Sequence, residues 1–533
     1  MTDLTPQAAA LFHRTPPDLR ETPDDGRPRA MVFAIRYHYI GTAVEVVLAH
    51  ALRLRGFRTE VLLCDQVMPA CDHRDIDRDT PEACRDCARR SRALFEAAGL
   101  PVRFLSEFIG PDRRAALESR VAAIPDDLLT DAEYRGVDVG KIALASTLRY
   151  FLRGRLETPD HFAQFRKFRV TAMMMAEIGQ GVMDARRPSA VAVSHGIYVT
   201  WGVLADVARR NGARVTVWGY GYRRNSILVS QGETYHRDLL TEPHSHWRDR
   251  PFPDSERETV ERYLQSRVNG GLDWIHYAPN PEVDREAVRS ALNLDPERPA
   301  VGLFTNLCWD AAVLFRGAAF PDMHAWLLET VQWALARPEL QLVIRCHPAE
   351  VRRRSETREK AADVLRAAFP NLPDRMKIVP PESDLSTYTL SELMDLCLVY
   401  SSKVGLEFAA RGLSVVTAGE AFYREKGFTD DPPDPAAYFD RLNRAKRRER
   451  ISEAKRTLCL RYAHHYFFRR HVTVNYFDDH GMGNDVTGFG MDHFGKLAPG
   501  RDPDLDRLCD GILRGKPLFA AEREAEYRDR VSR

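Results

Sequence analysis

Two long stretches of this 533-residue sequence alternate short apolar runs with helical patterns, and this alternation constrains the fold most strongly. In the first stretch, the run AMVFAIR is followed by a helical pattern that ends at Gly56, and then by the run RTEVLLCD. A strand, a helix and a second strand within about thirty residues form a βαβ unit, which requires a parallel sheet. The second stretch repeats the pattern through AVGLFTNL, QLVIR, LCLVYSS and LSVVTAG. The sequence therefore predicts an α/β protein with two Rossmann-like domains that face each other across a central cleft.

The composition of the segments between these patterns suggests the domain boundaries. Residues 1–29 are polar and rich in proline, which predicts a flexible leader before the first strand. The N-terminal domain is expected over residues 30–285 and the C-terminal domain over residues 296–475, with a charged, irregular stretch as the link. Residues 476–533 are expected to form a C-terminal extension.

The charge balance limits the classes of partner. The chain has 77 basic and 76 acidic side chains, so it lacks the basic excess typical of nucleic-acid binding. An anionic ligand must then be held by local geometry. No apolar run approaches the roughly 20 residues that cross a bilayer, and the N-terminus lacks the apolar region of a signal peptide. We therefore expect a cytoplasmic protein, for which peripheral docking at the inner face of the membrane stays open.

The segment LCLVYSSKVGLEFAARG is the sharpest candidate for a binding site. A buried strand delivers Ser401 and Ser402 to the start of a helix, whose first backbone N–H groups lack partners and carry partial positive charge. Together with Gly405, these groups could hold a diphosphate or a nucleotide monophosphate. Glu407 could reach a ribose hydroxyl. The alternative is that the serines only cap the helix and that Glu407 is a surface residue.

The segment RCHP follows the strand QLVI and is the second candidate. Pro348 stiffens the turn, so that His347 is presented at the end of the strand. The imidazole could donate to a phosphate oxygen and stabilise the departing nucleotide, and Arg345 could add a fixed positive charge. The alternative is a loop histidine that bonds only to the backbone.

Three further loops follow predicted strands. In GLFTNLCWD, Thr305 and Asn306 could contact the donor or the acceptor, and Asp310 could be a base or a helix cap. In SHGIYVTWG, His195 could act as the base for an acceptor hydroxyl, or could be structural. The loop YHYIGT could line the acceptor site with Tyr39 and Gly41, since glycine permits close backbone approach.

Four cysteines lie close together in the sequence with the spacing C-x6-C-x12-C-x2-C. The final CxxC pair suits thiolate ligation of zinc, and His73 is a further candidate ligand. The loop therefore carries either a structural zinc ion or free thiols. The candidate ligands are Cys64, Cys71, Cys84 and Cys87.

With these loops in place, the chain resembles the bacterial capsule polysaccharide biosynthesis family, whose best-known members are Kdo transferases with the GT-B fold. The resemblance rests on RCHPAE, on YSSKVGLEFAARGLSVVTAGEAFYREKGFT and on AAYFDRL. It implies a transferase that needs no metal for catalysis, with His347 and Pro348 in the nucleotide-binding motif and Ser401 and Ser402 on the phosphate. It also implies that the C-terminal extension packs back across the domains. Lys403 departs from the family pattern, and the acidic catalytic residue of the N-terminal half has no clear counterpart.

The leading hypothesis is sugar transfer from a CMP-Kdo-like, UDP-linked or GDP-linked donor to a capsular or other cell-surface polysaccharide. The C-terminal domain would bind the nucleotide sugar, and the N-terminal domain the glycan or glycolipid acceptor. Contact with a capsule-assembly complex stays open. Three alternatives remain, namely a polyol-phosphate transferase of the teichoic-acid type, a nucleotide-sugar epimerase and a non-catalytic scaffold for capsule assembly.

Overall fold

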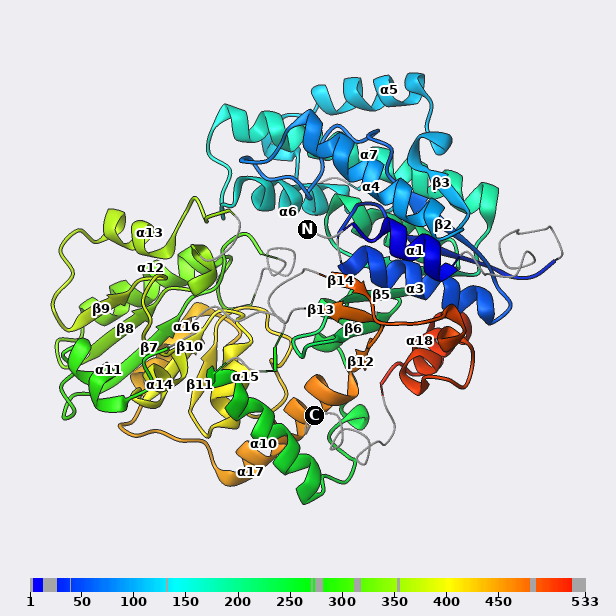
Figure 1. Cartoon of the computed structure of the whole chain (residues 1–533). Helices are drawn as coiled ribbons and strands as arrows, with labels where there is room; N and C mark the ends of the chain where they lie inside the picture. The colour runs from blue at the N-terminus through cyan, green and yellow to red at the C-terminus, as the bar shows by residue number, and fades with distance from the viewer. Residues whose placement is uncertain are drawn as a thin grey trace. The chain divides into compact units, whose positions relative to one another are not determined.

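The computed structural model of the chain (Figure 1) contains two compact α/β units. It describes residues 3–12, 26–38, 40–130, 133–269, 272–273, 281–310, 318–351, 355–479 and 486–519. Unit 1 comprises the described residues up to 151, residues 156–238 and the described residues from 468 onward. Unit 2 comprises residues 152–155 and the described residues from 239 to 467. The prediction of two Rossmann-like domains is confirmed, but the first boundary falls at residue 238 instead of 285.

The sheet of unit 1 has the strand order β12-β6-β5-β4-β1-β2-β3. Strands β3, β2, β1, β4 and β5 are parallel, while β6 and β12 are antiparallel to their neighbours. The order reverses between β1 and β4, and ligands of doubly wound sheets bind at such a switch point. The strands are β1 (Arg29–Phe33), β2 (Arg58–Leu63), β3 (Val102–Phe104), β4 (Ala190–Ser194), β5 (Arg214–Tyr220), β6 (Ser226–Gln231) and β12 (His471–Thr473).

Unit 1 is rich in helices. They are α1 (Thr5–Phe12), α3 (Ile40–Leu54), α4 (Pro81–Ala97), α5 (Pro111–Ala122), α6 (Val139–Phe151), α7 (Pro159–Arg186), α8 (Val203–Arg210) and α18 (Pro503–Arg514). Helix α7 begins at a Thr158 cap followed by Pro159, which suits the first helical position. None of the described helices is long and apolar enough to span a bilayer.

The sheet of unit 2 is entirely parallel, with the strand order β11-β10-β7-β8-β9. Its switch point lies between β7 and β10. The strands are β7 (Ala300–Phe304), β8 (Gln341–Arg345), β9 (Met376–Val379), β10 (Leu396–Val399) and β11 (Val415–Thr417). The main helices are α10 (Asp254–Asn269), α11 (Arg285–Ala291), α12 (Met323–Leu335), α13 (Ala361–Ala368), α14 (Thr387–Glu392), α15 (Val404–Ala410), α16 (Pro435–Asn443) and α17 (Glu453–His464). All the strands except the edge strand β9 are buried along their whole length, as a sheet covered on both faces requires.

Both ends of the chain differ from expectation. Within the predicted flexible leader, residues 5–12 form helix α1, because Phe12 is buried and stacks on His50 with ring centroids 4.1 Å apart. After residue 467 the chain belongs to unit 1, where β12 adds to the sheet beside β6 and α18 packs on α3 and β5. The described part of the predicted C-terminal extension is thus an integral part of unit 1.

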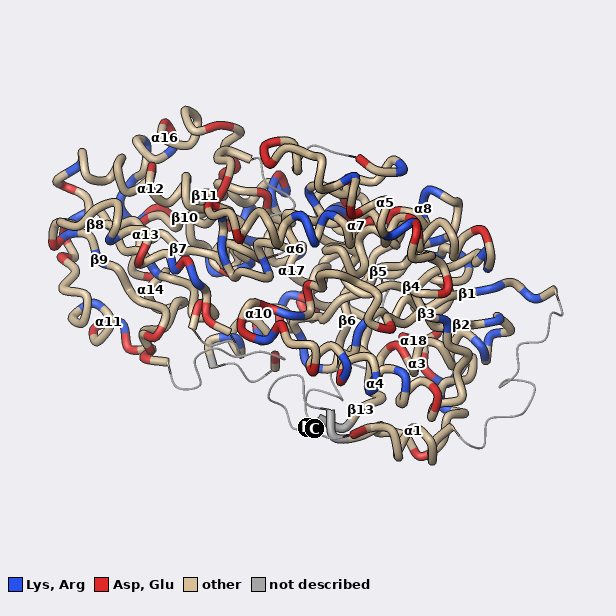
Figure 2. Tube along the Cα trace, turned by 90° about the horizontal axis from the view of Figure 1, so that it is seen from above, with Lys and Arg blue, Asp and Glu red and all other residues tan. Residues whose placement is uncertain are grey.

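Charged residues of both signs are interspersed along the described chain (Figure 2). This agrees with the balanced composition. Affinity for an anion therefore has to come from particular side chains and backbone groups, and the loops at the carboxyl ends of the strands are the places to look for them.

Candidate functional site

Three loops of unit 2 meet at the carboxyl edge of its sheet, beside the switch point. They follow β7, β8 and β10, which are neighbours in the order β10-β7-β8. The Asn306 side chain after β7 donates through Nδ2 to Ser401 Oγ after β10, at 2.8 Å. The Thr305 hydroxyl accepts from the backbone N–H of His347 after β8, at 2.9 Å. The structure therefore brings together four of the residues that were selected from the sequence.

The geometry of His347 defines which ring nitrogen carries its proton. His347 is the N-cap of a short 3-10 helix, Pro348–Glu350, and its Nδ1 accepts from the Ala349 backbone N–H at 3.1 Å. Because a backbone N–H can only donate, Nδ1 carries no proton, and the neutral ring must hold its proton on Nε2. In half-buried His347 the ring N–H is therefore on Nε2, and Pro348 occupies the first position of the short helix that follows.

The two serines do not cap the helix that follows them. The N-cap of α15 is Lys403, whose side chain makes no capping hydrogen bond. Ser401 is half-buried and accepts from Asn306, so its own hydroxyl hydrogen can be donated to a ligand. Ser402 is buried, and its carbonyl accepts from the Tyr423 hydroxyl at 2.6 Å. The capping alternative is therefore wrong. Of the two serine hydroxyls, that of Ser401 is the more accessible to a ligand, because Ser402 is buried.

Glu407 lies inside unit 2 and is surrounded by partners. It is 1% exposed, and its carboxylate pairs with Arg267 Nε at 2.9 Å and with Lys403 Nζ. Its other oxygen accepts from the Tyr388 hydroxyl at 2.5 Å. Both carboxylate oxygens are thus engaged, and we assign Glu407 to the support of the serine loop in place of the expected ribose contact.

Arg345 also has a supporting role. Its side chain is buried, and it donates to the carbonyl oxygens of Pro380 at 2.5 Å and Ser383 at 3.0 Å. These bonds satisfy the guanidinium and fix the segment between β9 and α14. The guanidinium was expected to place a positive charge beside the phosphate, but it instead forms hydrogen bonds inside unit 2.

Gly405 is required for packing. A Cβ atom there would lie 2.2 Å from the Tyr423 hydroxyl oxygen and 3.0 Å from Val399 Cγ2. Because Tyr423 also holds the Ser402 carbonyl, this contact positions the loop, and the expected phosphate contact of Gly405 is indirect.

Gly405→Ala is expected to destabilise unit 2 by about 1–3 kcal/mol, because overpacking forces the Tyr423 ring to move. The midpoint of thermal unfolding measures this loss. The double variant Gly405→Ala/Tyr423→Phe removes the nearest atom and should regain part of the lost stability. A single variant that unfolds at the wild-type temperature would contradict the steric role.

Asp310 is half-buried at the end of a described segment, so its role as a base stays a prediction. Helix α12 has a cap of its own, Asp322, whose side chain accepts from the Ala325 backbone N–H at 2.9 Å. The residues directly after Asp310 lie outside the described part of the chain, so both roles that the sequence left open for it stay predictions.

Unit 1 has its own cluster of polar side chains at the switch point. His195 follows β4 with a left-handed backbone (φ 53°), and its Nδ1 lies 2.7 Å from the Tyr235 hydroxyl. His38 follows β1, and its Nδ1 lies 2.6 Å from the Tyr220 hydroxyl. Burial, with Arg36 nearby, lowers the pKa of His38 well below its ordinary value, so this imidazole is neutral at pH 7.

His38 was not selected from the sequence, although its loop was. The residues named there were Tyr39, which lies outside the described residues, and Gly41. A Cβ atom at the buried Gly41 would lie 2.7 Å from the Tyr220 hydroxyl oxygen and 2.9 Å from His38 Nδ1, so the glycine makes room for this hydrogen-bonded pair. The position of His38 after the first strand, beside the switch point, is the signal that could have found it.

The four cysteines of the loop in unit 1 are not gathered into one tight group of ligand atoms. The Cys87 thiol accepts from the Tyr37 backbone N–H at 3.3 Å, and burial raises the pKa of Cys64 to about 12. In the part of the chain that the structure describes, one group of three or more potential ligand atoms lies within 4.8 Å of one another, and it contains none of these four cysteines. Zinc at this loop stays a prediction.

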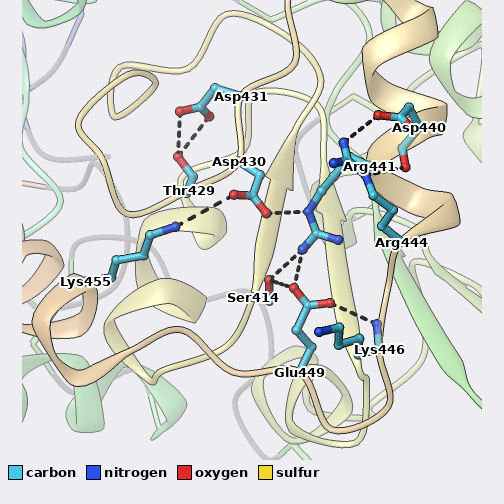
Figure 3. A network of polar contacts seen from close by, with 10 residues as sticks. All are labelled: Ser414, Thr429, Asp430, Asp431, Asp440, Arg441, Arg444, Lys446, Glu449 and Lys455. Carbon is cyan, nitrogen blue, oxygen red and sulfur yellow. Dashed lines mark hydrogen bonds and ion pairs between the residues drawn. The ribbon is translucent and has the colours of Figure 1, made fainter.

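The motif AAYFDRL is part of the framework around the site. Figure 3 shows the Arg441 side chain between Asp430, at 2.6 Å, and Glu449. Tyr438 is buried and accepts from Trp326 Nε1 of α12 at 2.8 Å. Asp430 forms a β-bridge with Val416 of β11, so these contacts connect α16 to that strand and to α12. The motif therefore contributes to the stability of unit 2.

Comparison with known proteins supports the resemblance in the same region. Residues 283–467 match the family model described as capsule polysaccharide biosynthesis protein. No curated protein sequence matches the chain. Among solved structures, KpsC of Thermosulfurimonas dismutans, a β Kdo 2,4 transferase, is 18% identical with a TM-score of 0.33, covering 52% of this chain and 79% of that chain.

A UDP-GlcNAc 2-epimerase from Neisseria meningitidis is 11% identical with a TM-score of 0.24, covering 81% of this chain and 93% of that chain. The calicheamicin glycosyltransferase CalG4 is 13% identical with a TM-score of 0.26, covering 83% of this chain and 94% of that chain. At TM-scores this low, the similarities to solved structures carry no argument about the chemistry of this chain.

Proposed function

We propose, from the capsule polysaccharide biosynthesis family whose model residues 283–467 match, that this chain is a glycosyltransferase. It moves a sugar from a nucleotide-activated donor to a capsular or other cell-surface polysaccharide. The observation that carries the proposal is the hydrogen-bonded coupling of three loops at the switch point of unit 2, through Asn306 with Ser401 and Thr305 with His347. A set of donors fixed in this way suits the phosphates of a nucleotide sugar.

In this proposal the donor phosphates receive hydrogen bonds from His347 Nε2 and from the Ser401 hydroxyl. When the bond between sugar and phosphate breaks, negative charge grows on the phosphate oxygen, and donors already in place stabilise it. His347 is fixed by Ala349 and Ser401 by Asn306, so neither side chain has to reorganise. Charge stabilisation by protein groups is the reason to propose a transferase that needs no metal for catalysis.

We place the acceptor on unit 1. The histidines at its switch point, His195 and His38, are hydrogen-bonded to tyrosine hydroxyls, which hold the rings in fixed orientations. A neutral imidazole can take the proton of an acceptor hydroxyl, and this role replaces the acidic residue that the sequence did not reveal. A cytoplasmic location, with docking at the inner face of the membrane, belongs to the same proposal.

A panel of nucleotide-linked donors tests the proposal. The full-length protein is incubated with CMP-, UDP-, GDP- and CDP-linked donors, with and without a glycan acceptor, and the released nucleotide is measured. We expect one donor class to release its nucleotide in an acceptor-dependent manner. Release only from a CDP-polyol would indicate the polyol-phosphate transferase, and sugar isomerisation without acceptor would indicate the epimerase. If no donor is turned over, the transferase proposal is wrong and a non-catalytic scaffold is favoured.

A further inference from the structure

A cysteine, a histidine and a glutamate from three separate segments of unit 2 converge near the loop after β7, which carries Thr305 and Asn306. Cys308 lies in the loop after β7, His324 in the first turn of α12, and Glu359 just before α13. One potential ligand atom from each, a thiol sulfur, a ring nitrogen and a carboxylate oxygen, lies within 4.8 Å of the other two. Cys308 and His324 are buried, and the Glu359 side chain is 11% exposed.

We propose that Cys308, His324 and Glu359 bind a zinc ion that fixes the loop carrying Thr305 and Asn306. This mixture of sulfur, nitrogen and oxygen ligands suits zinc, which binds all three at about 2.0–2.3 Å. Ligand atoms around a tetrahedral ion lie about 3–4 Å apart, so small side-chain rotations bring these three into range. The fourth position is left to water or to another protein group.

The surroundings of the three residues orient them as ligands of a metal site are oriented. The Gly154 backbone N–H donates to Glu359 Oε2 at 2.8 Å, which leaves Oε1 facing His324 Nδ1 at 3.5 Å. A Cβ at position 154 would lie 3.0 Å from His324 Cε1 and 3.1 Å from Cys308 Cβ, so the glycine allows the backbone to approach closely. A fixed carboxylate and a tightly packed ring are the outer contacts that hold metal ligands in place.

A zinc ion here would join three segments that the sheet alone leaves separate. Cys308 comes two residues after Asn306, whose side chain holds Ser401. Next to the cluster, Trp309 Nε1 donates to Thr357 Oγ1 at 3.0 Å, which already ties the same two segments together. The ion would also attach α12 to these two segments through His324. It would thereby limit movement of the loop that carries Thr305 and Asn306, without taking part in the transfer itself.

The test uses the full-length protein purified without chelators. For the variant Cys84→Ser/Cys87→Ser, which lacks two candidate ligands of the cysteine loop in unit 1, we expect about one zinc per chain by elemental analysis. Its X-ray absorption spectrum should show one sulfur at about 2.3 Å and the remaining ligands, nitrogen or oxygen, at about 2.0 Å. The wild type is measured in parallel, so a failure of the variant to fold does not leave the proposal untested. One zinc per wild-type chain with three or four sulfurs around it would place the ion at the cysteine loop of unit 1 and overturn the proposal, as would metal-free wild-type protein.

Variants then assign the ligands. Cys308→Ser is expected to lose the zinc, whereas Cys459→Ser, which replaces another buried thiol of unit 2, keeps it. The double variant Cys84→Ser/Cys87→Ser should also keep its zinc. Zinc retained by a folded Cys308→Ser protein would overturn the assignment. Because the readout is metal content, it is independent of whether the transferase assay finds a donor.

Discussion

The variant His347→Asn is expected to turn over donor about 10²- to 10³-fold more slowly than the wild type, with an unchanged midpoint of thermal unfolding. Asparagine is a good N-cap, and its side-chain oxygen can still accept from the Ala349 backbone N–H as His347 Nδ1 does. It is too short to replace the Nε2–H donor. The substitution therefore removes the bond to the phosphate and keeps the bond that shapes the turn.

Two further variants sharpen this experiment. His347→Gln reaches farther and should recover part of the activity, because its amide nitrogen can approach the position of Nε2. His493→Asn makes the same substitution at an exposed histidine of unit 1 and should leave both rate and stability unchanged. A wild-type rate for His347→Asn, measured with the donor that the panel identifies, would remove His347 from the proposed mechanism.

The sequence was most informative where a local pattern decides the structure. The helix expected to end at Gly56 ends at Leu54, two residues before that glycine, and helices α8 and α15 end at the same distance before Gly212 and Gly412. Each of these glycines has a positive φ between 81° and 84°. Glycine adopts this left-handed conformation without a steric cost, so the signal is contained in a few residues. The same holds for Pro348, which fixes the turn that presents His347.

Partners that are distant in the sequence explain what could not be predicted. The Arg345 side chain donates its hydrogen bonds to backbone carbonyl groups about 35 residues later in the sequence. Glu407 is paired with Arg267, which lies 140 residues earlier, on α10. A pattern around either residue contains no trace of these contacts. Helix α1 was missed for the same reason, since its proline-rich neighbourhood suggests a leader while Phe12 packs on His50.

The buried ionic group around Glu407 leads to the second large effect. Burial alone would raise the pKa of the Glu407 carboxyl, but Arg267 and Lys403 outweigh it and hold the pKa at about 2. Burial and the neighbouring Arg267 lower the pKa of Lys403 to about 8. The pKa values of Glu407 and Lys403 are both lowered, so Lys403 is not held in its charged form by the pair. Arg267 is therefore the cation that mainly stabilises the charged Glu407 carboxylate.

Glu407→Gln is therefore expected to destabilise unit 2 by about 3 kcal/mol at pH 7, because a pKa lowered from 4.5 to about 2 represents roughly that free energy. The carboxylate is charged in both folded and unfolded chains above pH 4.5, so its full contribution is present there. As the pH falls from 4.5 toward 2, the carboxylate takes up a proton in the unfolded chain before it does so in the folded chain. The wild type then loses the stability that the charged Glu407 gives to the folded state. The difference between the two unfolding midpoints should consequently shrink across that range.

Thermal unfolding of the wild type and of Glu407→Gln at several pH values between 7 and 3 checks this expectation. Glu261→Gln is the matched control, because it makes the same substitution in a more exposed ion pair with Arg456, for which little change is expected. The experiment also separates the two roles considered for Glu407. If its carboxylate held a ribose hydroxyl, Glu407→Gln would raise the KM for the donor at unchanged stability. A structural carboxylate predicts the reverse, with a lower unfolding midpoint and, at temperatures where the variant stays folded, a KM close to that of the wild type.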